Sequence, residues 1–161
     1  MNDEPRLELL PEKILIGRKT RMSFAENRTR ELWQSFMPRR KEVPNVVNTY
    51  LYSVEQYDPY FFDSFDPGAE FIKWAAVEVS DADHVPDNME VLVLPSGLYV
   101  VFIHRGTASK AVETYEYIFR TWLPSSDYTV DDRPHFALVG DKYRPEDPDS
   151  EEEIWIPVRP K

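Results

Sequence analysis

The pattern of apolar and polar positions in the first half of the chain predicts short strands around one helix. Apolar runs at residues 7–9 and 14–16, separated by Pro11, are typical of strands. Residues 48–54 alternate with period two, and residues 71–79 form a longer run rich in β-branched and aromatic side chains. Four strands are therefore expected before residue 80.

A first helix is expected between the second and third of these strands. A capping-box motif, a serine followed three residues later by a glutamate, occurs at Ser23-Phe24-Ala25-Glu26, so we expect the helix to begin there. Apolar side chains then recur at helical spacing until Pro38, which ends the pattern. The apolar face consists of Leu32, Trp33, Phe36 and Met37.

The second half repeats this order of elements. Apolar runs at residues 89–94 and 98–104 flank Pro95-Ser96-Gly97, which predicts a hairpin. A second amphipathic helix follows a cap at Thr107 or Ser109 and ends near Pro124. The last two strands are expected at residues 135–140 and 152–158.

The two halves resemble each other when the chain is shifted by 86 residues. The shift aligns Ile14-Leu15-Ile16 with Val100-Val101-Phe102, and Met37-Pro38 with Leu123-Pro124. We therefore expect an α+β fold made of duplicated βαββ halves, about residues 5–80 and 89–159 of a single domain 1–161. The halves would form one curved antiparallel sheet with two helices packed on one face and a central ligand cleft.

Composition narrows the possible partners. The chain has 161 residues, of which 42% are hydrophobic, and a net charge of −10. A chain of this length buries about 70% of its surface, enough for one core. No segment approaches the ~20 apolar residues of a membrane helix, and the negative charge repels nucleic-acid phosphates. We expect no membrane partner and no direct nucleic-acid contact.

The absence of cysteine and the small numbers of histidine and glycine argue against several kinds of catalytic and metal site. The chain has no cysteine, which excludes disulfides and thiolate chemistry. The three histidines, His84, His104 and His135, lack metal-ligand spacing, and the five glycines do not form a phosphate loop. We predict no cofactor and no metal. The acidic start lacks the features of a signal peptide, so a cytoplasmic location is expected.

Two strands carry side chains that could contact a ligand. Alternation along residues 70–79 places Trp74 and Glu78 on one face, where a carboxylate beside an indole could hold a cation or transfer a proton. Tyr50 and Tyr52 likewise share a face and could line a cleft. The alternative interpretation is that the rings fill the core and that Glu78 is solvated at a strand end.

Tyr99 and a loop rich in aromatic residues are the remaining candidates for ligand contact. Tyr99 lies on a central strand, and its hydroxyl would need a partner such as Glu78 if it is buried. The loop 57–68 contains five aromatic rings, more than a solvated connection needs. We expect this loop to fold back as a lid or to pack on an edge.

Four ordered sequence blocks carry a family resemblance. The blocks are Pro95-Ser96-Gly97-Leu98-Tyr99, His104-Arg105-Gly106, Trp122-Leu123-Pro124 and Ile156-Pro157-Val158. In these blocks the chain resembles the GyrI-like, AraC-type effector-binding domain. The resemblance implies a duplicated α+β fold whose cleft binds lipophilic, often cationic, small molecules. Drug-binding relatives carry a Glu after the equivalent of Phe136 and often a Tyr two residues later, whereas this chain has Ala137 and Val139.

The leading hypothesis is a stand-alone domain, without a helix-turn-helix, that senses or sequesters a lipophilic or aromatic small molecule. Its cleft would be lined by Tyr50, Tyr52, Trp74, Glu78 and Tyr99. One alternative is a hydrolase of electrophilic, cyclopropane-bearing molecules, in which Glu78 activates water and Tyr99 or Tyr52 assists. Another is an acidic inhibitor that binds a protein partner through residues 146–153. A monomer is expected.

Overall fold

The computed structural model describes residues 4–62, 66–140, 144 and 146–161. The strands in this part of the chain are β1 (Arg6–Leu10), β2 (Lys13–Met22), β3 (Leu51–Gln56), β4 (Phe71–Val79), β5 (Glu90–Leu94), β6 (Gly97–Arg105), β7 (Tyr128–Val130), β8 (His135–Val139) and β9 (Glu151–Pro160). The helical segments are α1 (Thr29–Phe36), η1 (Met37–Glu42), η2 (Ala108–Lys110), α2 (Ala111–Tyr117), η3 (Ile118–Trp122) and α3 (Leu123–Ser125).

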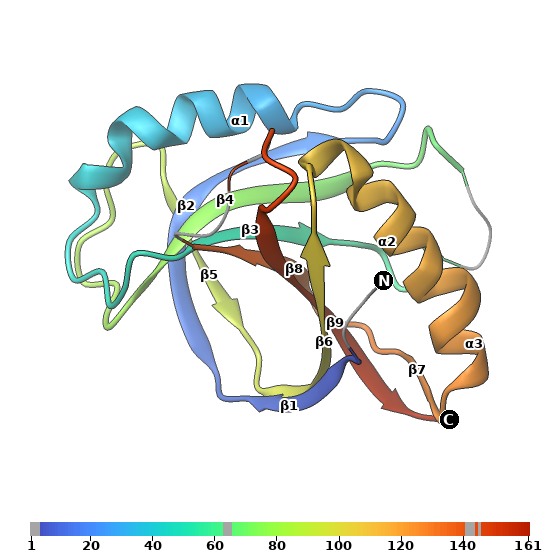
Figure 1. Cartoon of the computed structure of the whole chain (residues 1–161). Coiled ribbons are helices and arrows are strands. Elements are labelled where there is room, and N and C mark those ends of the chain that lie inside the picture. The colour runs from blue at the N-terminus through green and yellow to red at the C-terminus, as the bar shows by residue number, and fades with distance from the viewer. Residues whose placement is uncertain (1–3, 63–65, 141–143, 145) are drawn as a thin grey trace.

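The strands form one antiparallel sheet in the order β1-β6-β9-β8-β3-β4-β2-β5, with β7 added on β9. The two halves of the sheet have equivalent strand orders when each is counted from its end toward the centre. One half is β1-β6-β9-β8 and the other is β5-β2-β4-β3 (Figure 1). At this centre β3 and β8 pair, with Ser53 opposite Ala137. The α+β class and the curved antiparallel sheet expected from sequence are confirmed.

The predicted hairpin of β5 and β6 is wrong, although both strands exist. β5 pairs with β2, and β6 pairs with β1 and β9. The pairs Leu10–Gly97 and Lys13–Leu94 lie in one continuous register across the turns at residues 11–12 and 95–96. The chain therefore builds one long bent ribbon from distant segments. The turn residues 95–97 could not reveal this arrangement, because β5 and β6 pair with distant strands instead of with each other.

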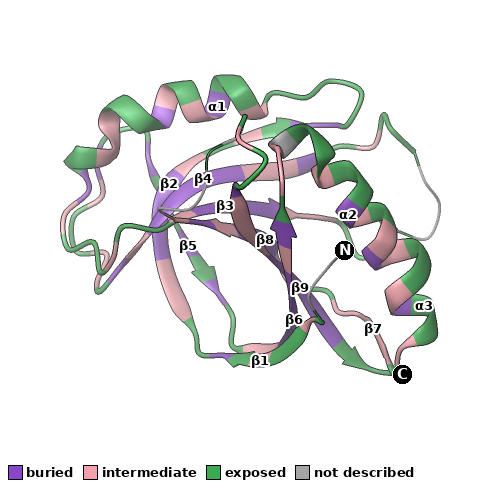
Figure 2. Ribbon diagram, viewed as in Figure 1, coloured by how far each residue is buried: buried purple, intermediate pink, exposed green. Residues whose placement is uncertain are grey.

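Each helix covers its own part of one face of the sheet (Figures 1 and 2). On the first half, Leu32 and Phe36 of α1 pack on outward-facing residues of β2 and β4. On the second half, Ile118 and Leu123 pack on β6 and β9. These residues recur at helical spacing, so burial of the apolar stripe stabilises the helices in place.

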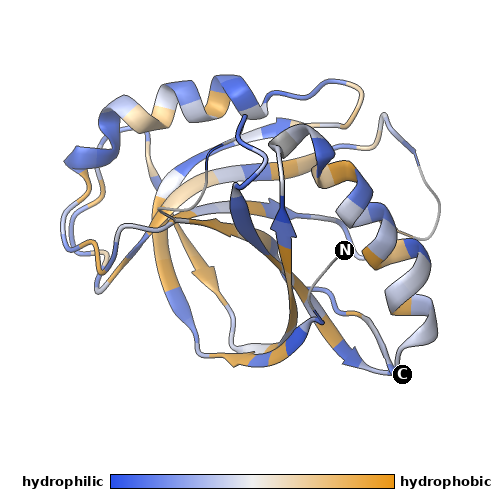
Figure 3. Cartoon of the chain, in the orientation of Figure 1, coloured by the Kyte–Doolittle hydropathy of each residue, from blue (hydrophilic) through white to orange (hydrophobic). Residues whose placement is uncertain are grey.

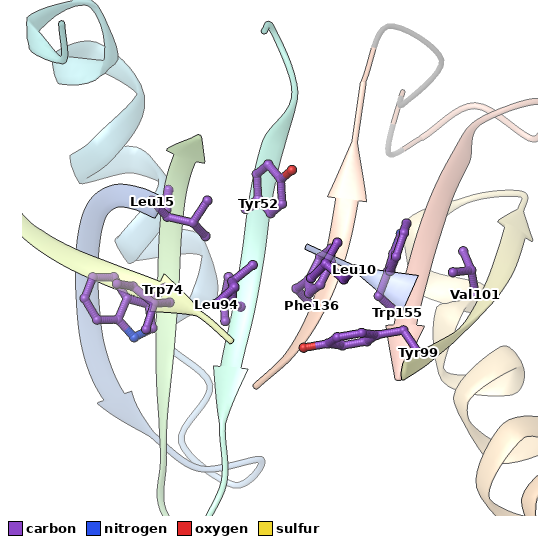
Figure 4. Packing of buried hydrophobic residues seen from close by; sticks show 12 residues of the cluster. Leu10, Leu15, Tyr52, Trp74, Leu94, Tyr99, Val101, Phe136 and Trp155 are labelled. Carbon is purple, nitrogen blue, oxygen red and sulfur yellow. The ribbon is translucent and has the colours of Figure 1, made fainter. Parts of the chain in front are cut away.

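The other face of the sheet curves around a second core. This core draws side chains from eight strands, and most of it is strongly hydrophobic (Figure 3). The Phe136 and Trp155 rings are stacked with centroids 5.2 Å apart, and the Tyr99 ring lies against both (Figure 4). We call this side of the sheet the inner face and the helix-covered side the outer face.

Two further sequence predictions need correction. Ser23 accepts a hydrogen bond from the Glu26 amide at 3.0 Å, as a capping box requires, but α1 begins only at Thr29. The N-cap position is Arg28, which makes no side-chain cap, and the Thr29 amide donates to the Asn27 side chain at 2.9 Å. Strand β7 was not expected, because its three residues are too short to show a period. None of the helices described is long and apolar enough to cross a membrane.

Candidate functional site

The pairing of β3 with β4 brings Tyr52 and Glu78 together on the inner face, whereas the sequence suggested Tyr99 as the partner of Glu78. The Tyr52 hydroxyl donates to Glu78 Oε1 at 3.1 Å, Lys13 Nζ lies 3.3 Å from Oε2, and Asn48 Nδ2 lies 3.4 Å from Oε1. Burial raises the pKa of the Tyr52 hydroxyl, helped by the nearby Glu78 charge, so Tyr52 stays a donor. The Glu78 carboxylate is therefore fixed by three neighbours.

Trp74 and Tyr99 share the inner face with this pair but do not touch Glu78 through their polar atoms. Trp74 Nε1 donates to Gln56 Oε1 at 2.6 Å, and the Tyr99 hydroxyl donates to the Pro134 carbonyl at 2.9 Å. Both residues are buried in the inner core. Burial raises the pKa of the Tyr99 hydroxyl to about 12, although Arg133 acts in the opposite sense.

Tyr50 lies at the rim of the inner face. Its ring covers Gly140, where an added Cβ would stand only 2.6 Å from a ring carbon. The residue is 45% exposed, and its amide donates to the Asn48 side chain at 3.0 Å. Of the five residues predicted from sequence, Tyr50 and Glu78 are the ones that a ligand from solution could reach.

A cavity of about 510 Å³ lies elsewhere, where the loop after β3 meets the connection from β7 to β8. Its lining comes from both halves of the chain. The lining residues are Tyr57, Asp58, Pro59, Tyr60, Phe62, Thr129, Val130, Asp131, Asp132, Arg133, His135 and Arg159. A volume of this size suits a drug-sized molecule, for which sites of about 300–1,000 Å³ are usual. None of the five predicted residues lines this cavity.

Aromatic rings form one wall of the cavity. The Phe62 ring stacks on Phe119 with centroids 5.1 Å apart and on His135 with centroids 5.4 Å apart. The Tyr57 ring meets His135 edge-on at 4.9 Å and also contacts Phe61 at 4.5 Å. Of the aromatic loop 57–68, which is predicted to fold back or to pack on an edge, residues 57–62 do fold back, and residues 63–65 lie outside the described residues. The sequence indicated the packing but not the cavity, because the opposite wall comes from residues 129–135.

At the inner end of the cavity the side chains of His135 and Tyr57 are neutral, whereas Arg133 of the same lining is charged. Burial lowers the pKa of His135 to about 3, helped by the nearby positive charge of Arg133, so the imidazole is neutral at physiological pH. Burial also raises the pKa of the Tyr57 hydroxyl, which stays protonated. A flat ligand would therefore meet aromatic and neutral surfaces at this end.

The opposite wall carries charges that are largely paired. Arg133 Nε donates to Asp131 Oδ2 at 2.9 Å, and Arg159 lies 3.5 Å from the same carboxylate. A further Arg133 nitrogen donates to the carbonyls of Leu98 and Val158, so its guanidinium joins three parts of the sheet. The pKa of Asp131 is lowered because its hydrogen bonds to Arg133 and to a backbone amide outweigh the opposing effect of burial. Asp58 and Asp132 are exposed carboxylates at the opening.

Behind the aromatic wall, the outer face of the central strands carries a buried ion pair. Glu55 Oε2 lies 2.5 Å from Lys73 Nζ, and burial raises the pKa of the Glu55 carboxyl against the opposing effect of Lys73. Burial also raises the pKa of Glu152, whose charge interacts with both residues. Ala137 lies on the same face two positions along β8 from His135, which is the partner of Glu55 in the sheet.

The described histidine and carboxylate side chains do not point to a metal site. Among the described residues, no group of three or more His, Asp or Glu side chains is arranged to hold a metal ion. His104 has a structural environment, since Nδ1 lies 2.8 Å from Thr114 Oγ1 and Nε2 lies 2.9 Å from the Thr107 carbonyl. The acidic segment at residues 146–153 divides between a turn and the start of β9.

The comparisons with known proteins agree on one family. The family model described as the GyrI-like small molecule binding domain matches residues 3–159. The chain is 28% identical over 132 residues to the transcriptional regulator BrlR of Pseudomonas aeruginosa. That match covers 80% of this chain but 45% of BrlR, so the chain spans about half the length of this relative.

Solved structures share the fold. The structure of SAV2435 bound to tetraphenylphosphonium matches with a TM-score of 0.72 and 21% identity, covering 98% of this chain and 94% of that one. EcmrR in its complex with DNA matches with a TM-score of 0.73 and 17% identity, covering 98% of this chain and 58% of that one. For this chain, the absence of nucleic-acid contact stays a prediction.

Proposed function

The chain belongs to the GyrI-like small molecule binding domain family, and we propose that it binds a lipophilic, aromatic small molecule in the cavity beside His135. The observation that carries the proposal is a cavity of about 510 Å³ with stacked rings on one wall and a neutral imidazole at its inner end. Aromatic pairs contribute about 0.5–1.5 kcal/mol beyond the burial of their area. Aromatic rings of the ligand would be stabilised both by burial of their surface and by ring–ring contacts.

A positive charge on the ligand is compatible with this site. Arg133 and Arg159 are engaged by Asp131, whereas Asp58 and Asp132, which also line the cavity, form no ion pair with another described residue. Behind the wall, two carboxylates, Glu55 and Glu152, share one lysine. We therefore include hydrophobic cations, such as the tetraphenylphosphonium bound by SAV2435, in the proposed ligand class.

The contacts of Glu78 favour binding over hydrolysis. Its carboxylate accepts from Tyr52, Lys13 and Asn48, so a catalytic water would compete with three protein donors for its two oxygens. The inner-face residues Tyr50, Tyr52, Trp74, Glu78 and Tyr99 stay a proposal for a second ligand contact, with Tyr50 and Glu78 as its accessible members.

Calorimetric titration tests the proposal with two probes of similar shape, cationic tetraphenylphosphonium and neutral triphenylphosphine oxide. We expect binding of at least one probe, and Phe62→Ala should weaken it about tenfold, equivalent to 1.4 kcal/mol. Tyr50→Ala tests the alternative site, since Tyr50 is an exposed aromatic residue at the inner face and outside the cavity. If Tyr50→Ala abolishes binding and Phe62→Ala does not, the ligand binds at the inner face instead. Failure of both probes to bind the wild type would contradict the proposed ligand class.

A further inference from the structure

Strand β5 leaves an apolar edge of the sheet open. It pairs with β2 on one side, and it is the last strand of the order, so no described strand pairs with its other side. Val91 and Val93 on its outer face are 40% and 47% exposed. Figures 2 and 3 show the strand as hydrophobic yet partly exposed. Such an edge is a template for pairing with another strand.

We infer that β5 pairs antiparallel with β5 of a second copy of this chain, extending the sheet across a two-fold axis. A register centred on Leu92 places Val91 opposite the partner's Val93 and Val93 opposite the partner's Val91. The four valines then cover one another on the outer face, where each is now exposed to water. The strand is therefore complementary to itself in both backbone and side chains.

The charges of β5 fit this register. Glu90 is the only charged residue of the strand, and it would lie opposite the partner's Leu94 rather than another carboxylate. In its own copy the Glu90 carboxylate lies 3.2 Å from Lys19 Nζ, so it keeps this cation when the two strands pair. Like charges placed directly opposite each other destabilise a strand pair, and this register avoids them.

Strand β1 occupies the corresponding end of the sheet and lacks this complementarity. Leu7 and Leu9 are 47% and 78% exposed on its outer face. A register centred on Glu8, however, would place two carboxylates directly opposite each other, and charged side chains are a usual device against edge pairing. Of the two edge strands, β5 is therefore the one that we expect to pair with a second copy. The inference departs from the expectation of a monomer, and it does not depend on the proposed ligand cavity.

The absence of cysteine allows a test of the register itself. Opposite residues of antiparallel strands have Cα atoms about 4.5–5.5 Å apart, within the range of a disulfide. Val91→Cys should therefore cross-link to Val93→Cys when the two variants are mixed and oxidised. Each variant alone should cross-link much less, because two copies of the same position would lie about 8 Å apart in this register.

Analytical ultracentrifugation of the wild type over a wide concentration range gives the second readout. We expect a reversible dimer whose dissociation constant rises about tenfold or more in Val93→Lys, equivalent to at least 1.4 kcal/mol. Leu9→Lys, the same change at the matching edge of β1, should leave it unchanged. A wild type that stays monomeric at every concentration would overturn the inference. Equal cross-linking in the mixed and the separate samples, or none in either, would do the same.

Discussion

The rings of Phe62 and His135 lie 5.4 Å apart and only 26° from parallel, although 73 positions separate them in the chain. This contact joins the loop after β3 to the first residue of β8, and both residues line the same cavity. The imidazole is 5% exposed and is held in its neutral form. The contact therefore links the proposed ligand-binding surface to a titratable group.

The buried His135 makes stability depend on pH. In the unfolded chain it gains a proton below its ordinary pKa of about 6.5, but in the folded chain only near pH 3. Its contribution is therefore complete above pH 6.5 and is lost as the pH falls toward 3. Between pH 7 and pH 5 we expect a loss of about 2 kcal/mol from this group. Urea unfolding at the two pH values measures it.

His135→Phe is the matched variant, because a phenyl ring fits among the surrounding aromatic rings without titrating. Its stability should fall less steeply between pH 7 and pH 5 than that of the wild type. The raised pKa values of Glu55 and Glu152 act in the opposite direction in both proteins, since these groups favour the folded state as the pH falls. Identical slopes for the two proteins would contradict the assignment of this effect to His135.

Trp74→Ala should act on stability first. The indole is 3% exposed, its nitrogen donates to Gln56, and Lys19 Nζ lies 5.5 Å from the centre of its ring. Removing it leaves a cavity in the inner core, which costs about 3–5 kcal/mol for a tryptophan. We expect a large drop in the urea midpoint with little change in ligand affinity of the folded fraction. A loss of affinity without a loss of stability would instead make Trp74 part of a ligand site.

Glu78→Gln separates the binding and hydrolase interpretations. The amide keeps the shape of the side chain and its bond with Tyr52, but it removes the charge that pairs with Lys13. We expect a stability loss below about 1 kcal/mol, because this ion pair is partly accessible to water. Incubation of an electrophilic probe, followed by mass spectrometry, should recover it unchanged from both proteins. Turnover by the wild type that disappears in Glu78→Gln would establish the hydrolase alternative.

Lys73→Met should strongly destabilise the fold. It leaves the carboxylate of Glu55 buried without its cation, a change that costs about 3–5 kcal/mol for buried pairs. The double variant Glu55→Gln with Lys73→Met should recover part of this loss, because no uncompensated charge remains. Urea unfolding of the two single variants and the double variant measures the coupling. Additive effects would show that the two residues do not act as a pair.

Much of the secondary structure and one half of the site could be predicted from the chain. Strand β4 has the bounds that its pattern predicts, and the shared face of Trp74 and Glu78 follows from alternation along that strand. The aromatic loop at residues 57–62 was recognised by its surplus of rings. Its partner wall was not, because Asp131 and Arg133 carry no local pattern that distinguishes them from an ordinary polar turn.

What the sequence determined by itself is therefore local: the period of each strand and helix, the capping contact at Ser23, and the blocks shared with the GyrI-like family. The tertiary structure alone decided which strands pair. It separated β5 from β6 and joined each to a distant strand, and it brought residues 57–62 to residues 129–135 around one cavity. The physical reason is that side-chain periodicity is fixed by backbone geometry within a segment, whereas pairing and cavity shape depend on contacts between segments far apart in the chain.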